Sequence, residues 1–205
     1  QGFKVAVLAI DPSSVFTGGS ILGDRIRMPQ INKNLYIRSL ATRGYLGGLS
    51  KAVGSAIKIL DAAGYEKIIV ETVGTGQSEI DIRNYAHIVL VVTTPNMGDD
   101  IQALKAGILE IGDIYVVNKA DLSGADKVVG DLTNMIQLFK SNKGEWIPPV
   151  LKVIAANGTG IKELVEEIEK YYSYLSESGL LSLNKFSMAE RELTEAIKES
   201  LLSKV

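Results

Sequence analysis

Short apolar runs alternate with helical patterns along this chain, and that alternation restricts the fold more than any other feature. Near-continuous apolar strands that alternate with helices form a parallel sheet that is covered on both faces. The sequence therefore predicts an α/β fold with a mostly parallel sheet and helices on both of its faces. The strand-like runs fall at residues 4–10, 67–72, 88–93, 114–117 and 149–154, and the helical patterns at 47–64, 99–109, 125–139 and 161–172.

The C-terminal part of the chain departs from this alternation. A mixed Ser/Gly/Leu stretch at 175–183 reads as a connector, and Ser187 and Glu190 have the spacing of a capping box at the start of a helix over 187–204. This helix has an apolar face but no obvious place in the sheet. We therefore expect an α/β domain over 1–178 and a C-terminal helical extension over 179–205.

Three polar residues directly follow the run at 114–117 in the pattern Asn118-Lys119-x-Asp121. Ligands bind beyond the carboxyl ends of the strands in such sheets. The edge of guanine carries two adjacent hydrogen-bond donors, and the single carboxylate of Asp121 can accept both, at about 1.5–3 kcal/mol for each charge-assisted bond. Adenine lacks this pair. The pattern therefore predicts guanine recognition, with the stem of Lys119 along the base and Asn118 tying neighbouring loops together.

A second loop, at 155–160, lies one strand and one helix later and has the sequence AANGTG. Its first backbone N–H, that of Ala155, is placed to donate to the guanine carbonyl oxygen. The alternative is that the polar pattern is only the first turn of a helix, with Asp121 as its cap. The apolar strand before the pattern and the second loop at the right distance favour guanine recognition.

Two further strands end in acidic residues, Asp11 after the run at 4–10 and Glu71 near the end of the run at 67–72. Carboxylates at neighbouring strand ends can hold Mg²⁺ directly or through its waters. Gly74 follows closely, and a glycine lets a backbone N–H approach a terminal phosphate. The alternatives are that Asp11 is a turn residue before Pro12 and that Glu71 is a surface charge.

Charge and composition exclude several classes of function. With 22 basic and 24 acidic residues the net charge is −2, which predicts no nucleic-acid footprint. No apolar run reaches the roughly 18 residues that cross a bilayer, and no secretory signal is visible, so we expect a cytoplasmic protein that does not bind a membrane. The chain has no cysteine and a single histidine, His87, which opens an apolar run and is expected to be structural.

Five segments together resemble the ArgK/MeaB/MMAA family of G-protein chaperones, in the signal-recognition-particle/MinD-like branch of the P-loop GTPases. The resemblance covers at least residues 1–165 in order. The segments are VAVLAIDPSS (5–14), FTGGSILGDRIRM (16–28), RGYLGGL (43–49), VETVGTGQSE (70–79) and VVNKADL (116–122).

The resemblance implies a function. Members of the family hydrolyse GTP slowly, bind methylmalonyl-CoA mutase, gate the loading of adenosylcobalamin into that enzyme and protect it from inactivation. The implied ligands are GTP or GDP with Mg²⁺. The implied partners are the mutase and a second copy of the chain, with the last helix as the possible start of a dimerisation arm. The alternative is that this helix packs back on the sheet.

The resemblance also implies residue roles, and it gives the guanine and Mg²⁺ residues the same roles as above. The first switch matches 16–28, where Asp24 is a candidate Mg²⁺ ligand, direct or indirect. The second switch matches 74–79. Gln77 lies there near the place of a residue that orients the attacking water, and the alternative is a solvated switch residue with no such role. A mobile loop that responds to the mutase matches 95–105, with Asp99, Gln102 and Lys105 as its expected contacts.

The chain departs from the family pattern at two points. Ile154-Ala155 stands where the family usually has Ser-Ala, so a hydroxyl that could brace the loop is gone. The larger departure is that no G-x-x-x-x-G-K-[ST] motif, and no Gly-Lys pair, occurs in the chain. In the family that phosphate loop precedes the first strand-like run by a helix. We therefore expect the first strand and the phosphate loop to be missing, the chain to be part of a longer polypeptide, and this chain alone not to hydrolyse GTP.

Three alternatives remain. A metal-insertion GTPase of the same branch typically needs His and Cys ligands, of which the chain has His87 alone. A truncated, non-catalytic binding module is compatible with the missing phosphate loop. An amino-acid transport kinase, an older label in this family, needs a nucleophile that the sequence does not identify.

Overall fold

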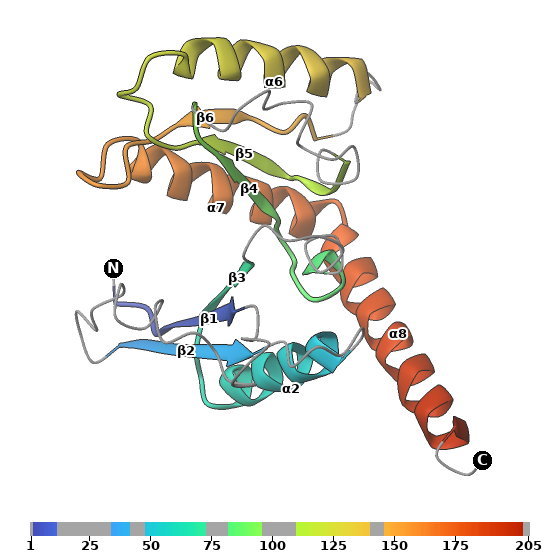
Figure 1. The fold of residues 1–205 in the computed structure, drawn as a ribbon. Helices are drawn as coiled ribbons and strands as arrows, with labels where there is room; N and C mark the ends of the chain where they lie inside the picture. Colours follow the sequence, from blue (N-terminus) through green and yellow to red (C-terminus); the bar gives the residue numbers. More distant parts are fainter. Residues whose placement is uncertain are drawn as a thin grey trace. The chain divides into compact units, whose positions relative to one another are not determined.

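The computed structural model describes residues 2–11, 34–41, 48–72, 82–95, 110–139 and 146–202. The chain divides into two compact units, Gln1–Ala86 and His87–Val205. Each unit is built on its own three-stranded sheet, and every strand pairing within the two sheets is parallel (Figure 1). The predicted α/β class with parallel strands and helices is confirmed.

The first unit places a helix against a sheet with the strand order β2-β1-β3. Ala6 and Leu8 of the central strand are buried together with Leu60 of the helix, and this cluster forms the core of the unit. The helix ends at Ala62, just before Gly64, whose φ of 78° is the left-handed conformation that commonly follows the end of a helix. The elements are β1 (Val5–Asp11), β2 (Leu35–Ala41), α2 (Gly48–Ala62), β3 (Lys67–Thr72) and the short 3₁₀ helix η1 (Ile82–Asn84).

The second unit carries a sheet with the strand order β4-β5-β6 between two helices. Figure 1 shows α6 and α7 on opposite faces of this sheet. All four residues of the central strand β5 are buried, because Ile114 and Val116 pack with Tyr171 and Leu175 of α7 while the alternate residues face the other side. The elements are β4 (Leu90–Thr93), β5 (Ile114–Val117), α6 (Ala125–Phe139), β6 (Val150–Lys152), α7 (Ile161–Glu177) and α8 (Leu180–Leu202).

Two sequence-based expectations differ from the structure. Strand β2 was not among the expected strands. The predicted connector at 175–183 and the predicted helix start at Ser187 are wrong, because α7 continues to Glu177 and α8 begins at Leu180. The break between these helices lies at Gly179, whose φ is 75°, and not at the capping-box spacing. The predicted helix at 99–109 lies outside the described residues.

Candidate functional site

The polar pattern that follows β5 forms a tight loop before α6. The N–H of Asn118 donates to the carbonyl oxygen of Thr93 at 2.8 Å, which fixes the start of the loop beside the end of β4. Lys119 then adopts a φ of 55°, a left-handed conformation that residues other than glycine seldom adopt. The N–H of Leu122 donates back to the Lys119 carbonyl at 3.0 Å. This turn places the residues of the pattern beyond the carboxyl end of the sheet.

Asn118 joins this loop to the loop after β6, as its predicted role requires. Its Oδ1 accepts hydrogen bonds from the N–H of Lys119 at 2.8 Å and from the N–H of Ala155 at 3.1 Å. A second bond runs alongside, from the N–H of Ala120 to the carbonyl oxygen of Val153 at 3.1 Å. The two loops are therefore held together by one side chain and by one backbone bond.

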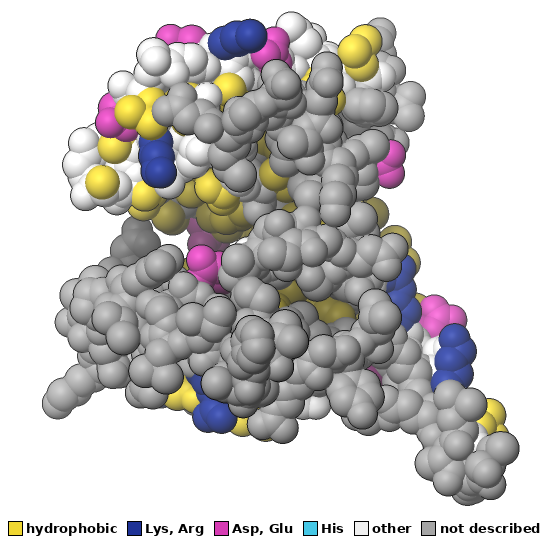
Figure 2. Space-filling view, viewed as in Figure 1, with side chains coloured by type: hydrophobic (Ala, Val, Ile, Leu, Met, Phe, Trp, Pro, Cys, Tyr) yellow, Lys and Arg dark blue, Asp and Glu magenta, His cyan; other side chains and the backbone are white. Residues whose placement is uncertain are grey.

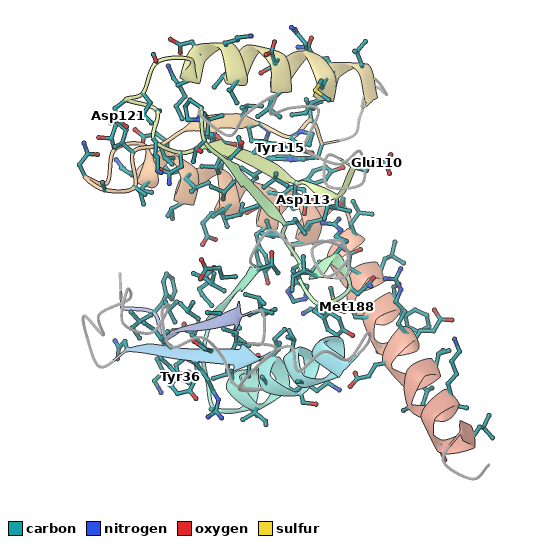
Figure 3. The ribbon with its side chains drawn as sticks, viewed as in Figure 1. Tyr36, Glu110, Asp113, Tyr115, Asp121 and Met188 are labelled. Atoms are coloured by element: carbon teal, nitrogen blue, oxygen red, sulfur yellow. The ribbon has the colours of Figure 1, made fainter. Side chains whose placement is uncertain are left out.

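Asp121 lies in the loop that links β5 to α6, as Figure 3 shows. The helix begins only at Ala125, so Asp121 does not occupy the capping position next to the helix that the alternative reading gave it. Its side chain is exposed. Within the described part of the chain, the Asp121 carboxylate forms no hydrogen bond or ion pair. The carboxylate is therefore open to two donors from a ligand.

The loop after β6 is closed by its own backbone. The N–H of Ile154 donates to the carbonyl oxygen of Thr159 at 2.9 Å, and the Ile154 carbonyl accepts the N–H of Gly158 at 3.0 Å. Inside the loop, Oδ1 of Asn157 accepts the N–H of Thr159 at 3.0 Å. These bonds brace the loop at the position where Ile154 replaces the expected serine.

The predicted donor to the guanine carbonyl, Ala155, already donates its N–H to Asn118. A base carbonyl would therefore share this N–H with the Asn118 side chain. The next residue, Ala156, is exposed, and its N–H meets no acceptor among the residues that the structure describes. The loop thus has two consecutive N–H groups, of which that of Ala155 is engaged and that of Ala156 has no acceptor among the described residues.

The two acidic strand ends lie on adjacent parallel strands of the other unit. Glu71 of β3 is in register with Ala9 of β1, and Asp11 is the last residue of β1, two positions further along. Both strands run the same way, so both acidic residues lie toward the same edge of the sheet. Two carboxylates with oxygen ligands from water and phosphate suit Mg²⁺. Among the described residues no group of three or more His, Cys, Asp or Glu side chains could hold a metal ion by itself.

Several predicted site residues cannot be placed because they lie outside the described residues. They are the phosphate-approaching glycine, the switch residues and the expected mutase contacts, namely Gly74, Gln77, Asp24, Asp99, Gln102 and Lys105.

Sequence reasoning missed a buried carboxylate, Asp113, at the start of β5. Only 3% of its surface is exposed. Its Oδ2 accepts the N–H of Val89 at 2.8 Å, its Oδ1 accepts the hydroxyl of Tyr171 at 2.7 Å, and its carbonyl accepts Nε1 of Trp146 at 2.9 Å. Figure 3 labels Asp113 beside the fully buried Tyr115. This network lies at the opposite end of β5 from the loop of Asn118 and joins β5 to α7.

The family model for "Methylmalonyl Co-A mutase-associated GTPase MeaB" matches residues 1–205. The chain belongs to the MeaB family. A candidate GTPase of Pyrococcus horikoshii is 48% identical over all of this chain and 66% of its own length. The mouse methylmalonic aciduria type A homolog, a protein named as mitochondrial, is 32% identical over 98% of this chain and 50% of its own length. The chain therefore spans two thirds or less of the length of these relatives.

A solved structure of similar fold is HypB from Helicobacter pylori in complex with nickel. It has a TM-score of 0.52 and 17% identity, and the match covers 85% of this chain and 74% of HypB. At this identity the likeness concerns the fold alone, and it agrees with the predicted α/β fold. In the part of the chain that the structure describes, no helix is both long enough and apolar enough to cross a membrane.

Proposed function

We propose that this MeaB-family protein binds GTP and GDP with Mg²⁺ and hydrolyses GTP, and that it acts as a chaperone of methylmalonyl-CoA mutase that gates adenosylcobalamin loading and protects the enzyme. The single observation that carries the proposal is the paired loop arrangement. Asn118 ties the loop after β6 to its own loop, and Asp121 presents an exposed carboxylate beside them. This is the arrangement that a guanine edge with two adjacent donors requires.

The proposed reaction is phosphoryl transfer to water, in which an enzyme mainly positions the reactants and neutralises charge on the phosphate oxygens. Glu71 and Asp11 are the residues proposed to hold Mg²⁺, and Gln77 is proposed to orient the water. No G-x-x-x-x-G-K-[ST] motif occurs within the 205 residues. The main phosphate contacts are therefore proposed to come from residues of the longer protein, in line with the greater length of the relatives.

The proposed link to the mutase rests on family membership. The family description names the mutase, and the name of the mouse relative refers to methylmalonic aciduria. Loss of the γ-phosphate would release the switch segments, and such a change from order to disorder is a common way for a GTPase to signal to its partner. Asp99, Gln102 and Lys105 remain the residues proposed to contact the mutase. A metal-insertion role has less support, because the family model that matches the whole chain is named for the mutase and not for metal insertion.

We also propose that the protein forms a homodimer through α8. Five apolar residues of this helix lie on one face at helical spacing, and each is more than half exposed. In Figure 2, hydrophobic and charged side chains both reach the surface along α8. A second copy of the helix would bury such a face. The five residues are Leu183, Phe186, Leu193, Ile197 and Leu201.

Asp121→Asn in the full-length protein tests the guanine-binding proposal. An Asn side chain offers one acceptor and one donor, which matches the edge of xanthine and not that of guanine. We expect the affinity for GDP to fall about a hundredfold and the affinity for xanthosine diphosphate to rise. Asp126→Asn is the control, because Asp126 is an exposed carboxylate of α6 that pairs with Lys152 at 2.9 Å. Equal effects of both substitutions on base preference would refute the proposal.

A further inference from the structure

Gly160, the residue before α7, lies where no side chain fits. Its φ is 76° and its ψ is −4°, in the left-handed region that favours glycine. A Cβ atom at this position would overlap the carbonyl oxygen of Lys152 and would lie 3.2 Å from both Cα and Cγ1 of Val153. The end of β6 and the start of α7 can therefore approach this closely only because residue 160 is a glycine.

The backbone that Gly160 touches is the part of the chain that carries both base loops. The N–H of Val153 donates to the Val117 carbonyl at 2.9 Å, and its carbonyl accepts the N–H of Ala120 at 3.1 Å. Two residues further on, the N–H of Ala155 reaches Asn118. A displacement of Val153 would therefore move the loop after β6 relative to the loop after β5.

Gly158 provides a contrast within the same loop. Its φ is 81°, close to the 76° of Gly160, but a Cβ atom there would meet nothing within 4 Å. Replacing either glycine by alanine imposes the same kind of backbone strain. Only at residue 160 does the new methyl group also collide with the end of β6.

We propose that Gly160 is a positioning residue for guanine selectivity. Its close approach to Lys152 and Val153 holds the loop at 154–159 against the loop of Asn118, so that the N–H groups of this loop face the base. A side chain at residue 160 separates the loops and removes the base-specific part of binding, while the phosphate and metal contacts remain. This proposal rests on the guanine-binding function proposed above.

The test compares Gly160→Ala with Gly158→Ala in the full-length protein. Calorimetric titrations with GDP and with ADP, in the presence of Mg²⁺, give the ratio of the two affinities for each variant. We expect Gly160→Ala to lower the GDP/ADP affinity ratio at least about tenfold more than Gly158→Ala does, with little change in the affinity for ADP. A purely structural defect would lower the fraction of binding-competent protein and would leave the ratio unchanged.

The possible failures can be told apart. If the wild-type protein prefers GDP and Gly160→Ala keeps that preference, the positioning role is refuted and the guanine site stands. If the wild-type protein binds GDP and ADP equally well, both the proposed guanine-binding function and the positioning role of Gly160 are refuted.

A second variant decides the matter if Gly160→Ala does not fold. Asn157→Ala removes the acceptor that braces the N–H of Thr159 at 3.0 Å, and Asn157 is exposed, so folding should be preserved. We expect this variant to lower the GDP/ADP ratio several-fold. An unchanged ratio would overturn the proposal, because the proposal makes the position of the loop at 154–159 decide the preference for GDP over ADP.

Discussion

At the scale of single residues, some residues of the candidate site could be predicted from the sequence and others could not. The proposed roles of Asn118 and Asp121 follow from a contiguous pattern after a strand, and Asn118 accepts a hydrogen bond from the loop that contains Ala155. The roles of Asp113 and Gly160 depend on neighbours that no local pattern names. Asp113 bonds to Tyr171, which lies 58 residues away. Gly160 lies against the backbone at the end of β6, and the sequence alone does not reveal that contact.

Removal of the Tyr171 hydroxyl tests the buried network around Asp113. In Tyr171→Phe, one oxygen of a buried carboxylate loses a donor at 2.7 Å. We expect the free energy of unfolding to fall by about 1.5–3 kcal/mol, the range for a hydrogen bond to a charged group, as measured by urea denaturation. Tyr174→Phe is the matched control, because Tyr174 stacks on Tyr171 in the same helix and its hydroxyl has no partner among the described residues. Equal losses in the two variants would contradict this role.

Tyr115 makes stability depend on pH in the alkaline range. Burial, followed by the negative charge of Asp113, raises the pKa of Tyr115 from 10.0 to about 12. Its contribution to stability is therefore complete below pH 10 and is lost as the pH rises from 10 to about 12, because the unfolded chain gives up the proton first. Denaturation of the wild type and of Tyr115→Phe between pH 9 and about 12 should show the steeper fall for the wild type. Parallel curves would contradict the assignment.

At the scale of secondary-structure elements, the apolar runs predicted the scaffold well. Strands β3 and β5 and helix α6 have the bounds that the sequence predicted. Strand β2 was missed because its sequence, LYIRSLA, mixes Arg38 and Ser39 into the run, and among the described strands it pairs only with β1. The boundary between α7 and α8 was misplaced because a local capping pattern within α8 outweighed the glycine at 179.

The prediction at this scale concerns dimerisation through the apolar face of helix α8. Leu193→Glu combined with Ile197→Glu places two charges in the centre of the exposed apolar face. We expect the double variant to be monomeric under conditions in which the wild-type full-length protein is dimeric, as measured by sedimentation equilibrium. Arg191→Glu, on the opposite face of the helix, should leave the dimer intact. A double variant that stays dimeric would exclude this face as the interface.

At the scale of the whole molecule, the recognition of the base and the binding of the metal are assigned to different units. Asn118, Asp121 and Ala155 all belong to the unit His87–Val205, whereas Asp11 and Glu71 belong to Gln1–Ala86. The residues proposed to contact the base therefore all lie within one unit. No G-x-x-x-x-G-K-[ST] motif occurs within the 205 residues, and we propose the main phosphate contacts for the longer protein. The full-length protein is therefore the form in which the account must be tested.

The most direct test is a calorimetric titration of the full-length protein with GDP and, separately, with ADP, each with Mg²⁺. Asp121 can accept both donors of guanine and would be left desolvated and unpaired by adenine. The account predicts that GDP binds at least about a hundredfold more tightly than ADP. Equal affinities for the two nucleotides would contradict guanine recognition by this loop and the function built on it.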